Sequence, residues 1–145
     1  MLDKAEDELK RADHLVYVTL KYTRTCDVIL NIIKRLINAY DSITNEALEY
    51  CKKKRKIKEI PTKDDEKVEL LSKKCKIRGI KQYFKLYFLM KKIQEARFTT
   101  KEEFRKNVTL ISHLDGRSLD VNMPLIFEYY DKTKEFVSLI RGWMK

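Results

Sequence analysis

The chain has 145 residues and a formal net charge of +10, with 43% hydrophobic and 37% charged residues. This length suits one domain with a single core, and three glycines and two prolines are far fewer than disordered chains carry. The N-terminal segment lacks the apolar stretch of a signal peptide, and no apolar run reaches the roughly 18 residues that span a bilayer. We therefore expect a soluble cytoplasmic protein with no membrane contact. Its expected fold is all-α: a single-domain helical bundle over residues 1–145.

Two helices are predicted before the first proline, Pro61. One apolar stripe recurs at spacings of 4, 3 and 4, which predicts a helix over about residues 3–20; it consists of Ala5, Leu9, Ala12 and Val16. A second stripe alternates spacings of 3 and 4 without a break: Cys26, Ile29, Ile33, Leu36, Tyr40, Ile43, Ala47 and Tyr50. It predicts one long central helix over about residues 24–55, capped by Thr23 or Thr25.

Further helices are predicted after Pro61, which gives a bundle of five to six. A short surface helix begins at the acidic residues 64–66 and reaches about residue 76, and a strongly apolar helix follows over about 80–96. The segment TTKEE, residues 99–103, offers two registers of a capping box and predicts another helix. Asn122 caps the last helix, with Pro124 in its first turn.

The segment around Asp115 and Gly116 allows two interpretations. The preferred one ends the preceding helix at Gly116 and continues as an extended link toward Asn122. The alternative is a small hairpin about the Asp115–Gly116 pair, because this dipeptide favours tight turns between strands.

Cysteine and histidine are too sparse to suggest a metal centre or a cofactor. Cys26, Cys51 and Cys75 are odd in number and far apart, which predicts neither a disulfide framework nor a zinc knuckle, so we expect them to be reduced. His14 and His113 are the only histidines in the sequence. Metal binding and acid–base catalysis therefore both have little support.

The positive charge is concentrated in one quarter of the chain. Residues 1–51 hold 7 Lys/Arg and 9 Asp/Glu, residues 52–85 hold 14 and 5, and residues 86–145 hold 11 and 8. The local net charges are therefore −2, +9 and +3. A field concentrated in this way attracts polyanions, among which nucleic acid is the commonest. The alternative is that these lysines only keep a small helical protein soluble.

Eleven basic residues form the candidate nucleic-acid-binding surface. They are Lys52, Lys53, Lys54, Arg55, Lys56, Lys58, Lys73, Lys74, Arg78, Lys81 and Lys85. Arg78, Lys81 and Lys85 are spaced by 3 and 4, so on a helix they would share one face, as phosphate contacts require. Tyr83 and Tyr87 are close in sequence, but tyrosines at helical spacing belong to a core more often than they stack on bases.

The run over residues 52–56 also has a structural explanation. It falls at the predicted end of the long helix, where cations interact favourably with the helix dipole and the free carbonyl groups. That explanation does not extend to the positive charge that continues to Lys85.

The long second helix, the tyrosine-rich last helix and the segment RADHLVYVTLKY, residues 11–22, resemble the HEPN superfamily of small helical domains. Many members of that family act on RNA as homodimers, through an arginine followed by a histidine after four to six residues. Here seven residues separate Arg105 from His113, and six separate Lys106 from His113. The resemblance therefore implies a non-catalytic relative that binds RNA, nucleotide or a protein partner.

Three functions follow from these observations, in order of preference. The first is a non-catalytic nucleic-acid-binding protein, associated with RNA foremost, that uses residues 52–85. The second is a homodimeric protein-interaction or scaffold bundle with no nucleic-acid role, because the apolar faces of the second and fourth helices are wide enough to supply an interface. The third is a divergent HEPN-type ribonuclease, which requires the side chains of Arg105 and His113 to converge.

Overall fold

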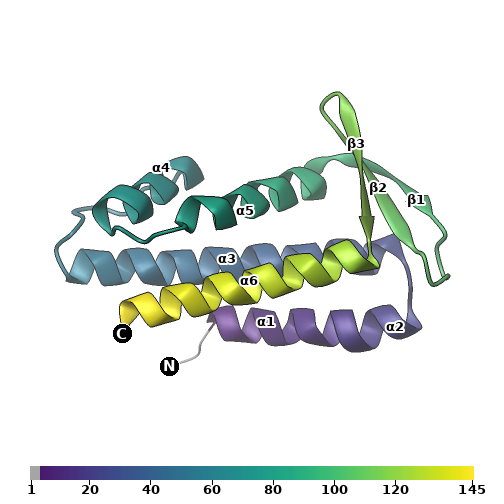
Figure 1. Cartoon of the computed structure of the whole chain (residues 1–145), viewed down its shortest axis with the longest axis horizontal. Coiled ribbons are helices and arrows are strands. Elements are labelled where there is room, and N and C mark those ends of the chain that lie inside the picture. The colour runs from purple at the N-terminus through teal and green to yellow at the C-terminus, as the bar shows by residue number, and fades with distance from the viewer. Residues whose placement is uncertain (1–3) are drawn as a thin grey trace.

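The computed structural model describes residues 4–145. Long helices lie side by side in a bundle, and a small three-stranded sheet stands at one end of that described part (Figure 1). The prediction of a mainly helical protein is confirmed. The prediction of a purely all-α fold is wrong, because three strands form within residues 97–122. No helix between residues 4 and 145 is long and apolar enough to cross a membrane.

The predicted central helix is confirmed as α3 (Cys26–Lys53), a helix of 28 residues. Thr25 caps it, since its side-chain oxygen accepts a hydrogen bond from the Val28 N–H group at 3.3 Å. The predicted apolar seam of α3 is buried, except that Tyr50 in the last turn is partly exposed. Through this seam α3 contacts α1 (Lys4–His14), α5 (Ile80–Glu95) and α6 (Met123–Met144).

Apart from the helix predicted at TTKEE, the remaining predicted helices are present, but two of them contain π-helical turns. The first predicted helix consists of α1, a π-helical turn η1 (Leu15–Thr19) and a last turn α2 (Leu20–Tyr22); its predicted first position, residue 3, lies outside the described residues. The predicted surface helix consists of α4 (Asp64–Glu69) and a second π-helical turn, η2 (Leu70–Lys74). The Asn122 side chain caps α6, as predicted, by accepting from the Leu125 N–H group at 3.0 Å.

Aromatic packing around Tyr40 occupies the middle of the core. The Tyr40 ring stacks on Phe136 of α6 with 4.4 Å between ring centroids and meets Phe84 of α5 edge to face at 5.9 Å. Its hydroxyl donates a hydrogen bond to the Tyr83 carbonyl oxygen at 3.0 Å, so the buried O–H group is satisfied. Such ring pairs stabilise a fold by about 0.5–1.5 kcal/mol each beyond their area burial. Tyr40 therefore joins α3, α5 and α6 at one point.

The three strands replace the helix that TTKEE predicted. In order along the chain they are β1 (Arg97–Lys101), β2 (Thr109–Leu114) and β3 (Arg117–Asn122), and they pair antiparallel in the order β1-β2-β3. Glu102 and Phe104 adopt positive φ angles of 58° and 65°, which no α-helix allows. Glu103 does cap a helix, but that helix is α3, because its carboxylate accepts from the Cys26 N–H group at 3.3 Å.

The alternative interpretation of Asp115 and Gly116 is the correct one. Strands β2 and β3 pair from Thr109 with Asn122 to Leu114 with Arg117, so the chain turns back at Asp115–Gly116. Gly116 has a φ of +71°, a conformation that glycine adopts without steric cost. The predicted extended link is therefore a hairpin strand.

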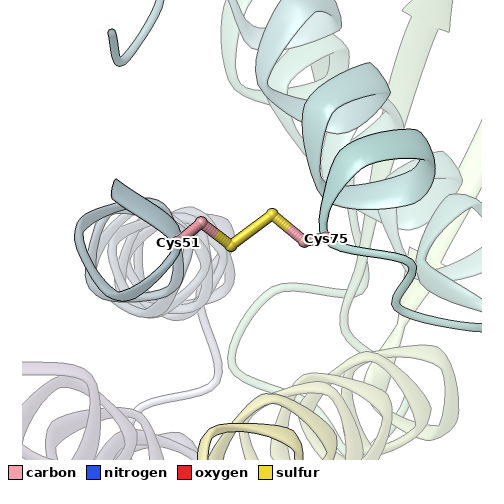
Figure 2. The surroundings of a disulfide bond; sticks show 2 residues. All are labelled: Cys51 and Cys75. Carbon is pink, nitrogen blue, oxygen red and sulfur yellow. A yellow bond between two sulfur atoms is a disulfide. The ribbon is translucent and has the colours of Figure 1, made fainter. Parts of the chain in front are cut away.

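Cys51 and Cys75 form a disulfide that joins the last turn of α3 to the end of η2 (Figure 2). Their Cα atoms are 6.5 Å apart, and both residues are buried. The prediction that all cysteines are reduced is therefore wrong for this pair. Because 24 positions separate the two in sequence, only the folding of η2 back onto α3 brings them together. Cys26 is a free buried thiol, and burial raises its pKa to about 11.

Reducing this disulfide should destabilise the protein by about 3 kcal/mol, the loop-closure entropy that a cross-link spanning about 24 residues removes from the unfolded chain. Urea denaturation with and without a dithiol reductant measures the difference. The double variant Cys51→Ser, Cys75→Ser is the matched control, since reductant should leave its midpoint unchanged. Alkylation of the unfolded chain should modify one thiol without reductant and three with it. Three modified thiols without reductant would show that the bond does not form.

Candidate nucleic-acid interface

All eleven predicted cations have exposed side chains, and most of them come from segments that meet at one end of the bundle. Lys52 and Lys53 close α3, residues 54–58 form the loop that follows, Lys73 and Lys74 close η2, and Arg78, Lys81 and Lys85 belong to the start of α5 and the turn before it. We call these eleven residues the basic end. The last turn of α3 and the loop after it lie at the left in Figure 1. Lys85 lies farther along the bundle, because the nearby Tyr83 carbonyl accepts the hydrogen bond of Tyr40 in the middle of α3.

The disulfide brings the two halves of the basic end together. Lys52 follows Cys51 directly and Lys74 precedes Cys75 directly, while the two bridged Cα atoms are 6.5 Å apart. The basic run at the end of α3 and the basic run at the end of η2, distant in sequence, therefore lie close together.

The end of α3 is a Schellman turn built without glycine. The Lys56 N–H group donates to the Cys51 carbonyl at 2.9 Å, and the Arg55 N–H group donates to the Lys52 carbonyl at 3.0 Å. Arg55 takes the left-handed position of this motif, with a φ of 60°, where glycine is usual. Lys76 has a φ of 56° after η2. The chain therefore changes direction after each basic run at a cationic residue in the left-handed conformation. This conformation costs a residue other than glycine roughly 1 kcal/mol.

Most of these cations have no acidic partner. Glu69 of α4 is the exception: its carboxylate lies 3.0 Å from Lys73 Nζ and 3.5 Å from Lys81 Nζ, and these contacts, Lys73 foremost, lower the Glu69 pKa. Lys54 and Lys56 lie over aromatic rings. The other seven side chains make no ion pair or hydrogen bond within residues 4–145: Lys52, Lys53, Arg55, Lys58, Lys74, Arg78 and Lys85.

A hollow of about 550 Å³ opens at the N-terminus of α5, beside the basic end. Its lining includes Lys76, Arg78 and Lys81, and Gly79, with a φ of +76°, occupies the N-cap position of α5. The first turn of α5 contains no acidic side chain, and no side chain caps it. The Gln82 N–H group donates to the Gly79 carbonyl at 3.3 Å, and the N–H groups before it, with the positive end of the helix dipole, add to the local positive potential.

An acidic groove limits the basic end on the side of α4. It has a volume of about 670 Å³, and its acidic lining consists of Glu59, Asp65, Glu66 and Glu69. A polyanion is repelled from this groove and attracted to the surface beside it. The electrostatic surface at this end is therefore divided rather than uniformly positive.

Tyr83 and Tyr87, which are close to the basic residues in sequence, are not available to stack on bases. Tyr87 is buried and donates a hydrogen bond to the Asp41 carboxylate at 2.6 Å. Tyr83 is partly exposed, but its hydroxyl lies 3.5 Å from Glu135 of α6. The aromatic residues at the basic end are instead Tyr50 and Trp143, in the last turns of α3 and α6. The sequence pattern assigned Tyr50 to the apolar seam of the long helix, and it gave no sign that Trp143 lies beside it, because the two are far apart in sequence.

Arg105 and His113 do not converge. His113 of β2 lies opposite Arg97, and its ring Nε2 atom is 3.2 Å from the Thr99 hydroxyl. Arg105 is in the loop beyond the Lys101–Thr109 pair, which lies four residues along β2 from His113. At about 3.3 Å per residue, the ladder alone separates them by roughly 13 Å. The joint action that a HEPN-type ribonuclease requires has no support from this arrangement.

Another polar cluster joins α3, α4 and α5. Tyr87 donates to Asp41 of α3, and Lys91 Nζ lies 2.7 Å from the Asp64 carboxylate of α4. Burial, opposed chiefly by the hydrogen bond from Tyr87, raises the Asp41 pKa above its usual value of 3.8, and the hydrogen bond to Asp64 raises the Lys91 pKa. Every partner in this cluster lies on a packed helix, which is the arrangement of a structural network.

Neither a search for metal sites nor a comparison with known proteins indicates a function. Among residues 4–145, no group of three or more His, Cys, Asp or Glu side chains is arranged to hold a metal ion. Comparisons with protein-family models, with curated proteins and with solved structures find no match to this chain. Function is therefore inferred from the charge and geometry of the basic end.

Replacing Asp41 should change the pH dependence of stability. Because the folded-state pKa of Asp41 is raised, the stability it contributes is fully present below about pH 3.8 and is lost as the pH rises through the raised value. Asparagine does not titrate, so Asp41→Asn should gain stability relative to the wild type between about pH 3.5 and about pH 7. Urea midpoints of both proteins at the two pH values measure this gain. A difference that stays constant with pH would contradict the assignment.

Proposed function

We propose that this protein binds nucleic acid, RNA foremost, at the basic end and catalyses no reaction. The observation that carries the proposal is the set of seven exposed cations without an acidic partner, of which Lys52, Lys53 and Lys74 are held close together by the Cys51–Cys75 bridge. Cations left free in the protein can neutralise phosphates of a ligand, and each neutralised phosphate releases condensed counterions. Solubility alone does not require that the positive charge be gathered at one end.

The hollow at the start of α5 supports the same proposal. Lys76, Arg78 and Lys81 surround the N-terminus of α5, where backbone N–H groups have no intrahelical partner. A phosphate group entering the hollow would meet side-chain cations and backbone donors together. Such contacts fix the position of a nucleic-acid backbone without reading its sequence, so we expect weak sequence preference.

A cytoplasmic location remains compatible with the disulfide. Disulfides persist in oxidising compartments and are uncommon where thiol reductants are abundant. Cys51 and Cys75 are exposed by only 0% and 1%, however, so a soluble reductant reaches the bond only after local opening. Once formed, the bond can therefore persist where thiol reductants are abundant, and we propose a cytoplasmic location.

The second candidate function is a homodimeric interaction protein, and exposed aromatic side chains favour it. Tyr22 is 80% exposed and Phe104 is 74% exposed. The Phe104 N–H group donates to the Arg24 carbonyl at 2.6 Å, so both aromatic residues lie near the turn between α2 and α3, far from the basic end (Figure 1). Exposed apolar surface of this kind is common at interfaces between copies. Light scattering that shows a dimer, without nucleic-acid affinity, would select this function.

Neutralising part of the basic end should weaken oligonucleotide binding. Lys52, Lys53, Lys58 and Lys74 have exposed side chains with no partner, so replacing all four with glutamine should leave the fold intact. The slope of log affinity against log salt should fall by up to about 3, because each lost phosphate contact removes roughly 0.7–0.9. Fluorescence anisotropy of a labelled RNA at several salt concentrations measures the slope.

The matched control replaces four exposed lysines elsewhere, Lys10, Lys21, Lys106 and Lys132, with glutamine. Both variants lose the same net charge, so a difference between them reports where the charge sits. Equal affinities of the two variants would show that binding depends on net charge alone. Absence of binding by the wild type at low salt would end the proposal.

Replacing Glu69 should have the opposite effect. Glu69→Gln removes the carboxylate that pairs with Lys73 and Lys81, so both ammonium groups become free for phosphate. We expect the affinity for RNA to rise roughly two- to fivefold, the range that one exposed ion pair represents. Glu128→Gln on α6 makes the same charge change away from the basic end and serves as the control. An equal gain in the two variants would contradict the assignment of Glu69.

A further inference from the structure

The rings of Tyr50 and Trp143 meet at the basic end. Their centroids are 5.2 Å apart and their planes lie at 67°, an edge-to-face arrangement. Both side chains are partly exposed, whereas Tyr40 and its ring partners Phe84 and Phe136 are buried. Trp143 packs against the margin of the core, so one side of the pair is fixed and the other faces solvent. Two helices that are distant in sequence thus present an aromatic surface among the lysines.

Each ring has an ammonium group over it. Lys54 Nζ lies 5.7 Å from the centroid of the Tyr50 ring, and Lys56 Nζ lies 5.4 Å from the centroid of the Trp143 ring. A lysine ammonium is strongly hydrated and sits on a flexible stem, so an exposed contact of this kind is weak. A planar group that stacks on the face of the ring can therefore displace the ammonium group.

A nucleotide supplies both groups that this arrangement suits. Its base stacks on an aromatic face, and its phosphate pairs with the ammonium group that the base displaces. Because the two rings are inclined at 67°, their faces point in different directions and would receive separate bases. Bases inside a duplex are already stacked and paired, so they cannot occupy these faces.

We propose that Trp143 and Tyr50 form a stacking platform for unpaired bases, so that the basic end takes single-stranded rather than duplex nucleic acid. This inference rests on the proposed function and adds the class of ligand to it. Lys54 and Lys56 move from the rings to the phosphates of the bound strand. The Schellman turn at Arg55 fixes the direction in which both lysines leave α3.

Intrinsic fluorescence tests the platform in the unmodified protein, because Trp143 is the only tryptophan in the sequence. A base stacked on the indole should quench its emission. We expect quenching by single-stranded RNA or DNA, and none by an abasic strand of the same length or by a duplex. The RNA and DNA arms show which sugar the site prefers, since only RNA offers a 2′-hydroxyl.

Substitution gives a second readout. Trp143→Ala should lower the affinity for a single strand by roughly 5- to 100-fold, the effect of losing one stacked base, and Trp143→Phe should restore most of it. Neither variant should change the affinity for the abasic strand. Tyr50→Leu should weaken binding, while Tyr22→Leu, at an exposed tyrosine away from the basic end, should not. Circular dichroism confirms that each variant is folded.

The outcomes separate this inference from the proposed function. Binding of single strands without quenching, and unchanged by Trp143→Ala or Tyr50→Leu, would overturn the platform and leave the phosphate interface standing. Equal affinity for abasic and base-bearing strands would do the same. No binding of any strand at low salt would overturn the proposed function, and the platform with it. Quenching by base-bearing strands together with a loss of affinity in Trp143→Ala would support both.

Discussion

Burial of the apolar face of α3 is the constraint on which the rest of the structure depends. A helix of 28 residues has little stability in water by itself, so its persistence comes from packing against α1, α5 and α6. Tyr40 lies at the middle of that packing, with one ring partner on α5 and another on α6. Because α3 is held in the bundle centre, the place where it ends also decides where the following lysines emerge.

The basic end carries an energetic cost that several local features offset. Crowded cations repel one another, and Arg55 and Lys76 adopt conformations that ordinary side chains avoid. The C-terminal dipole of α3 favours the lysines that close it, and Glu69 neutralises part of the field on α4. The Cys51–Cys75 bridge opposes separation of the two runs covalently. These features allow the fold to tolerate positive charge that has no acidic partner of its own.

The strands over residues 97–122 show where sequence patterns misled. Thr99, Thr100 and the two glutamates after them matched a capping box, but that motif describes only side chains and cannot exclude a strand. Thr99 and Thr100 instead pair with Ile111 and Leu110 across β1 and β2. Glu103 caps the start of α3, 77 positions earlier in the chain. A capping signal was thus present in the sequence, but the helix it serves could be identified only in the folded chain.

The sequence by itself determined the long central helix, the helical character of most of the chain, the hairpin alternative at Gly116 and the concentration of positive charge in residues 52–85. These are local properties, because apolar periodicity, turn residues and charge counts depend on neighbours within a few positions. Tertiary structure alone decided the Cys51–Cys75 bond, the meeting of the two basic runs, the separation of Arg105 from His113 and the contact of Tyr50 with Trp143. Each of these depends on how distant segments pack, and pairing across such distances leaves no periodic signal in one sequence.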